Sequence, residues 1–194
     1  MFVEKTAFEA RVTNNFRDDL INITGKYQKS SEDADCSAGW LCVRNGQLPC
    51  EGFTGVKNEN AWYMNDATTA TNAGDVVYAA NTYEIPLLRG KGKNLYAVGT
   101  ETLGLGIPAG RYGTFTKIVF DGDHAYRFGI GNLNAALSTN QYFTIDAGQL
   151  KPAASAPTAN GALYFKLLPD TGNFTEGTTA SFEYIDVQAF KVYA

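Results

Sequence analysis

His124 is the only histidine of the 194-residue chain, and it directly follows the segment Asp121-Gly122-Asp123. An imidazole beside carboxylates could take part in acid–base chemistry or bind a cation. The segment lacks the glutamate that a calcium loop carries, however, and Asp-Gly is typical of tight turns. We therefore expect Asp121 and Asp123 to be turn residues and His124 to be a partly buried structural residue.

Other catalytic patterns are equally weak. A serine or cysteine nucleophile needs an oriented base, and the chain offers one imidazole. Glycoside hydrolysis needs only two carboxylates, and among the 20 acidic residues Glu51 and Glu59, near Trp62 and Tyr63 in the sequence, come closest to such a pair. We expect the protein not to be an enzyme.

Two further motifs could bind a metal or a nucleotide. Cys36, Cys42 and Cys50 lack the close pairing and nearby fourth ligand of a zinc site. We expect structural thiols, with one disulfide formed after release from the cell as an alternative and a metal as the remaining one. Residues 104–109 match G-x-G-x-x-A but continue into a β-branched run rather than a helix, which predicts a glycine-rich loop between strands. No cofactor or metal is predicted.

Composition excludes several classes of partner. The net charge is −4 and there is no run of lysine and arginine, so we expect no nucleic-acid binding. No apolar stretch approaches the roughly 20 residues that span a bilayer, so we expect no membrane partner. Residues 1–11 contain acids and lack the apolar core of a signal peptide, which argues against secretion by that route.

The N-terminal region differs from the remainder of the chain. We predict an arm or extension over residues 1–50 and a β-rich body over residues 51–194. Apolar residues recur every four positions near the N-terminus, which fits either a helical stripe or an extended arm pinned by these side chains: Phe8, Val12, Phe16 and Leu20. The charged run over residues 30–35 predicts a solvated loop.

From residue 51 onward, β-branched and aromatic runs alternate with turn residues, which is typical of strands. The fold class we predict is all-β, a sandwich or partly closed barrel with a less regular N-terminal arm. Residues 114–120 and 124–130 should pair as a hairpin around Asp121-Gly122. Residues 151–157 should be a connector, because prolines remove ladder donors. The other expected strands cover 76–80, 82–88, 95–98, 162–168 and 180–193.

The last of these strands carries a second signal. Its apolar residues change phase between Tyr184 and Ile185 and again between Ala189 and Phe190. A regular strand cannot place all of them on one face. Either the strand contains bulges near residues 184 and 189, or both of its faces are buried, and both outcomes suit a central position in a sandwich or barrel.

Part of the chain resembles a family of phage proteins. The segments DADCSAGWLC (33–42) and LPCEG (48–52) resemble small proteins encoded beside the major capsid protein in tailed bacteriophages and prophages. The segments NLYAVG (94–99) and IPAGRYGTF (107–115) extend the resemblance over about residues 30–115. It implies a virion structural protein, and within that class a head decoration or capsid-stabilising protein on the outer head surface.

The resemblance also implies partners. Such a protein would bind the major capsid protein, self-associate as a dimer or trimer, and reach the capsid surface of the virion after assembly in the host cytoplasm. Aromatic side chains dominate interface energies, and the candidate capsid contacts are Phe2, Phe8, Val12, Phe16, Leu20, Trp40 and Leu41. The alternative is that these side chains close the protein's own core.

Two other functions remain open from the sequence. A carbohydrate-binding β-sandwich would use exposed aromatic residues such as Trp62 and Tyr63 as a platform for sugar rings. A tail or baseplate structural protein would share the β-rich composition and the lack of a catalytic pattern.

Overall fold

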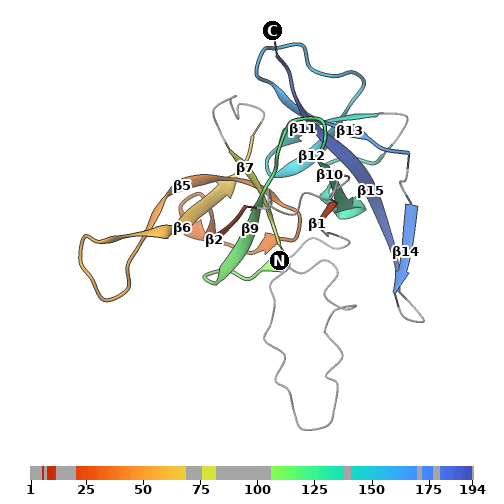
Figure 1. Cartoon of the computed structure of the whole chain (residues 1–194). Coiled ribbons are helices and arrows are strands. Elements are labelled where there is room, and N and C mark those ends of the chain that lie inside the picture. The colour runs from red at the N-terminus through yellow and green to blue at the C-terminus, as the bar shows by residue number, and fades with distance from the viewer. Residues whose placement is uncertain are drawn as a thin grey trace.

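The chain forms two β-sheet units that pack against each other (Figure 1). The computed structural model describes residue 6 and residues 8–11, 21–68, 76–81, 106–137, 141–169, 172–176 and 180–193. Within these ranges the secondary structure is β-strand apart from one 3-10 turn, η2 (Ile130–Asn132), which confirms the predicted all-β class. No helix in the described part is long and apolar enough to cross a membrane.

The first unit is a closed five-stranded barrel. Strand β2 pairs in parallel with β6 and antiparallel with β9, and this double pairing closes the order β2-β6-β5-β7-β9. The barrel strands are β2 (Asn22–Lys29), β5 (Leu41–Pro49), β6 (Lys57–Asp66), β7 (Val77–Ala80) and β9 (Tyr112–Lys117). The short strands β3 (Glu32–Asp33), β4 (Cys36–Ser37) and β8 (Gly106–Ile107) pair at its margins, β3 with β2 and β4 with β8.

Alternate side chains of the barrel strands point inward and form a small core. Tyr27, Met64 and Phe115 are almost completely buried there. The hydroxyl group of Tyr27 donates a hydrogen bond to the Asp66 carboxylate, and the Trp40 indole donates a second one to the same oxygen. The barrel is therefore filled by side chains and offers no open channel among the described residues.

The second unit is a seven-stranded sheet with the order β1-β10-β15-β13-β11-β12, in which β14 also pairs with β15. Its strands are β1 (Phe8–Arg11), β10 (Ala125–Gly129), β11 (Tyr142–Asp146), β12 (Gln149–Ala153), β13 (Leu163–Leu167), β14 (Gly172–Glu176) and β15 (Ala180–Lys191). The C-terminal strand β15 is central, as predicted. It pairs in unbroken register with β10 over residues 184–188 and with β13 over residues 187–191.

This register decides between the two explanations of the apolar phase shifts in β15, because no bulge interrupts it. Ile185, Val187 and Ala189 are fully buried on the core face. On the other face Phe190 stacks on Tyr164, with ring centroids 5.3 Å apart, and the Arg127 guanidinium lies 3.7 Å from the centre of the Tyr184 ring. Both faces of β15 are covered.

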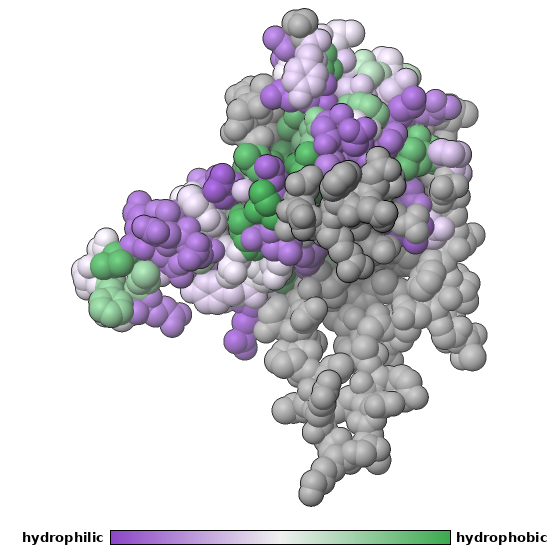
Figure 2. All heavy atoms as spheres, viewed as in Figure 1, coloured by the Kyte–Doolittle hydropathy of each residue, from purple (hydrophilic) through white to green (hydrophobic). Residues whose placement is uncertain are grey.

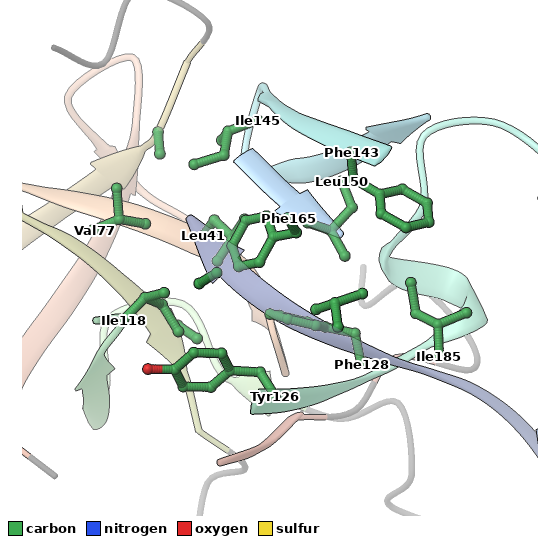
Figure 3. Close-up of a cluster of buried hydrophobic side chains, with 14 residues drawn as sticks. Leu41, Val77, Ile118, Tyr126, Phe128, Phe143, Ile145, Leu150, Phe165 and Ile185 are labelled. Atoms are coloured by element: carbon green, nitrogen blue, oxygen red, sulfur yellow. The ribbon is translucent and has the colours of Figure 1, made fainter. Parts of the chain in front are cut away.

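The main hydrophobic core lies between the sheet and the outer wall of the barrel (Figure 3). The barrel contributes Leu41, Val77 and Ile118, and the sheet contributes a larger set that includes Phe128, Phe143, Leu150, Phe165 and Ile185. Burying one such phenylalanine or leucine stabilises the fold by about 2 kcal/mol. Residues of β5 and β7 thus serve two cores, because their odd and even positions face opposite sides of the barrel wall.

Hydrogen bonds also join the two units. The tight turn between β11 and β12 lies against the barrel, where the Leu41 N–H donates to the Gly148 carbonyl and the Gly148 N–H donates to the Ala67 carbonyl, both at 2.8 Å. The buried Asn132 side chain donates to the Ala38 carbonyl at 2.8 Å. Polar groups at the junction are therefore paired across it.

Several sequence predictions need correction. The hairpin predicted around Asp121-Gly122 is wrong, because β9 belongs to the barrel and β10 to the sheet, so this turn carries the chain from one unit to the other. The division at residue 50 does not follow the fold either, since β2 and β5 are integral barrel strands. Pro152 lies within β12 rather than in a connector, which is tolerated because β12 is an edge strand.

Two predictions for the N-terminal half have a mixed outcome. Residues 30–35 include the exposed turn between β2 and β3, so part of the predicted loop is a short hairpin. Phe8–Arg11 is extended and pairs with β10, which at these residues excludes the helical stripe. Residues 12–20, and the predicted strands 82–88 and 95–98, lie outside the described residues.

Candidate partner-binding surface

The hairpin of β5 and β6 extends beyond the barrel and ends in a tip of residues 50–56 (Figure 1). The Cys50 N–H donates to the Val56 carbonyl at 2.8 Å, which closes the tip. Gly52 and Gly55 have φ angles of +82° and +77°, so the chain reverses through conformations that favour glycine. The backbone therefore presents the tip side chains away from the body.

The tip is apolar and exposed. Phe53 is 68% exposed and Val56 is 48% exposed, and Figure 2 shows this end of the molecule as a hydrophobic patch beyond a polar stretch of the hairpin. Tyr112, at the start of β9, is 44% exposed. Three of the five large apolar side chains that are exposed in the described part thus gather at the hairpin, a concentration that marks interaction surfaces.

A groove of about 480 Å³ lies beside the tip. Its walls are mainly apolar, with a few groups able to form hydrogen bonds and one carboxylate, that of Glu51. The lining residues are Thr24, Pro49, Cys50, Glu51, Phe53, Asn58, Ala61 and Tyr112. Its volume lies within the range of small-ligand clefts and could also admit one or two apolar side chains of a partner.

The barrel face next to the groove is more polar. Lys26 of β2 lies in register between Tyr63 of β6 and Tyr112 of β9. Its ammonium group forms an ion pair with Asp33 at 2.6 Å. The hydrogen bond between them raises the pKa of Lys26 and lowers the pKa of Asp33. Because its charge is already paired, Lys26 is a weaker candidate for binding an anion than an unpaired lysine would be.

The predicted sugar platform does not form from Trp62 and Tyr63. These neighbours lie on opposite faces of β6, with Trp62 packed against the barrel core and Tyr63 on the outer face. The Arg44 guanidinium lies 4.5 Å from the centre of the Trp62 ring and covers it. One face of the Trp62 ring is therefore already taken by Arg44. Of the candidate acids, Glu51 lines the groove and Glu59 is exposed on β6.

The segment Asp121-Gly122-Asp123-His124 forms a turn, as predicted. One Asp121 oxygen accepts hydrogen bonds from the backbone N–H groups of Asp123 and His124, and the carboxylate also contacts His124 Nδ1 at 2.8 Å. Partial burial alone would raise the pKa of Asp121, but these contacts lower it. The His124 side chain is 16% exposed, which confirms that it is partly buried.

Replacing His124 by glutamine should therefore lower the free energy of unfolding by at most about 1 kcal/mol, because the backbone donors still hold Asp121 and the contact is near the surface. Chemical denaturation of both proteins measures this difference. A loss of several kcal/mol would show that the His124 ring is needed to stabilise the turn. A loss of an enzymatic turnover would contradict the structural role.

The fold places two of the three cysteines together and the third apart from them. Cys36 and Cys42 are buried in the barrel core, whereas Cys50 is partly exposed and lines the groove. No group of three or more histidine, cysteine, aspartate or glutamate side chains in the described ranges is arranged to hold a metal ion. Gly106 and Ile107 of the glycine-rich motif form β8, which pairs with β4 in a connection between strands.

The candidate capsid contacts that the structure describes face inward. Leu41 is fully buried, and Phe8 packs against Tyr126 and Phe128 with ring centroids 6.0 and 5.4 Å apart. Trp40 is half-buried and hydrogen-bonded to Asp66 at 2.8 Å. These three residues close the protein's own core, the alternative left open by the sequence. The other candidates, Phe2, Val12, Phe16 and Leu20, lie outside the described residues.

Comparison with known proteins identifies no relative of the chain. No family model matches the chain, and neither a curated protein nor a solved structure matches it. The surface at the hairpin therefore has to be interpreted from its own geometry.

Proposed function

We propose that this chain is a structural component of a bacteriophage virion, and within it a decoration protein that binds the major capsid protein on the outer head surface. The observation that carries the proposal is the exposed apolar surface formed by the hairpin tip and its groove. A protein that presents Phe53 and Val56 to solvent gains stability when a partner covers them. The resemblance of residues 33–52 to proteins encoded beside capsid genes supplies the kind of partner.

The body of the protein suits this role. The barrel and the sheet share one core, and their junction is hydrogen-bonded, so the hairpin projects from a fixed base. A rigid body lowers the entropic cost of ordering an interface. A partner interface combines an apolar centre with a polar rim, and here Glu51 and Asn58 line the groove while the exposed Lys57 follows Val56 in the chain.

The binding proposal is tested by co-sedimentation. Heads that lack this protein are mixed with the purified full-length chain and pelleted, and the bound chain is quantified against its concentration. We expect saturable binding to heads and none to isolated tails. Protein that stays in the supernatant at micromolar concentration contradicts the proposal, and binding to tails alone would instead favour the tail or baseplate function.

A further inference from the structure

Two of the three thiols meet inside the barrel. Cys36 on β4 and Cys42 on β5 are both 0% exposed and belong to the same cluster of buried side chains. Cys36 is also among the groups that raise the pKa of the Cys42 thiol, as expected of two thiols that lie close together. Cys50 lies on the hairpin and lines the groove, so the fold selects one intramolecular pair from the three that the sequence allows.

Each of the two thiols also has a long contact with a backbone carbonyl oxygen. The Cys36 sulfur lies 3.9 Å from the Ser37 carbonyl oxygen, and the Cys42 sulfur lies 3.7 Å from the Trp40 carbonyl oxygen. Thiols are weak donors, and contacts this long hold them loosely. A turn with the Trp40 N–H donating to the Ser37 carbonyl at 3.0 Å brings the chain back, so that residue 42 returns towards residue 36.

We propose that Cys36 and Cys42 are a modification site, which forms an intramolecular disulfide when the folded protein meets a peroxide. One thiolate attacks a peroxide oxygen, the O–O bond breaks, and a sulfenic acid and one water result. The second sulfur then attacks the sulfenic sulfur, the S–O bond breaks, and a second water leaves. Two electrons pass from the thiol pair to one hydrogen peroxide.

The same burial makes the reaction slow. Burial, followed by the neighbouring Cys36 thiol, raises the pKa of Cys42, so little thiolate is present at neutral pH. Reduced thiols should therefore persist in a reducing cytoplasm. The bond should form over long exposure to an oxidising medium. This inference concerns the barrel interior and does not depend on the identity of the partner that binds the hairpin.

The test uses full-length protein carrying Cys50→Ser, which removes the exposed thiol. After incubation with hydrogen peroxide the protein is unfolded in denaturant and its free thiols are counted. We expect the count to fall from two to zero, and the tryptic peptide of residues 30–44, which contains both cysteines, to lose about 2 Da. The melting temperature should rise by about 5 °C and return after reduction.

Three outcomes would overturn the proposal. Thiols that remain free after prolonged oxidation would show that the two sulfurs cannot approach. A peptide carrying sulfinic or sulfonic acid would show oxidation without pairing. Disulfide-linked dimers would show pairing between chains. Cys36→Ser in the same Cys50→Ser background is the control, and its remaining thiol should give no mass loss in peptide 30–44.

Discussion

Replacing Phe53 by alanine should weaken binding of the protein to capsid heads by about 30-fold, which corresponds to about 2 kcal/mol. Phe53 is 68% exposed in the free chain, so its removal costs little folding stability, whereas a covered aromatic ring at an interface contributes strongly. Co-sedimentation titrations of the two proteins measure the change. The melting temperature should stay within a degree or two of the unmodified protein.

Tyr193 provides the matched control. It is 74% exposed, and it lies just beyond the end of β15, in the sheet unit rather than on the barrel hairpin. Tyr193→Ala removes a ring of similar size and should leave binding to heads unchanged. Equal losses in both variants would indicate non-specific adhesion through exposed rings. If Phe53→Ala binds heads as well as the unmodified protein does, the protein decorates heads but the hairpin tip is not its main contact.

The positions of several strands were predictable because their signals are local, whereas β2, β5 and β6 were not predicted. Strands β7, β13 and β15 coincide with runs of β-branched and aromatic residues, whose side chains suit a pleated and buried surface. The central place of β15 was also predictable, since apolar residues in both phases require two covered faces. These inferences depend on the residues of one segment only.

The pairing of strands was not predictable in the same way. Gly122 has a φ of +85°, as the Asp-Gly turn requires, yet the strands on either side of it join different sheets. A tight turn fixes the backbone for four residues, while the choice of neighbour depends on contacts between segments far apart in the sequence. β9, for example, pairs with β2, whose residues precede it by about 90 positions.

The candidate surface shows the same limit. Leu41 and Phe53 are both large apolar residues near turn signals, yet the first is 0% exposed and the second is 68% exposed. Leu41 is buried because the β11–β12 turn and the sheet cover this part of the barrel wall. One local signal did exist for Phe53. An aromatic residue between Gly52 and Gly55 in a turn has few chain neighbours that could bury it.

Replacing Gly148 by alanine should lower the free energy of unfolding by about 3 kcal/mol or more. Gly148 has a φ of +79°, in the left-handed region that costs other residues about 1–2 kcal/mol. A Cβ atom there would also collide with the Trp40 indole and lie 2.9 Å from the Asp66 carboxylate. The hydrogen bond between these two groups would have to break, which leaves a half-buried carboxylate with one donor fewer.

A second variant, at Gly46, separates the cost of the left-handed backbone from the cost of the collision. Its φ is +89°, but no atom lies within 4 Å of the position that a Cβ would take. Gly46→Ala should therefore lose only the cost of the left-handed conformation, about 1 kcal/mol. Urea denaturation monitored by tryptophan fluorescence measures both variants, and the Gly148→Ala loss should be at least twice the other. Equal losses of unfolding free energy would show that Trp40 and Asp66 move aside from the new Cβ at little cost. The contact with them would then not hold the barrel and the sheet together.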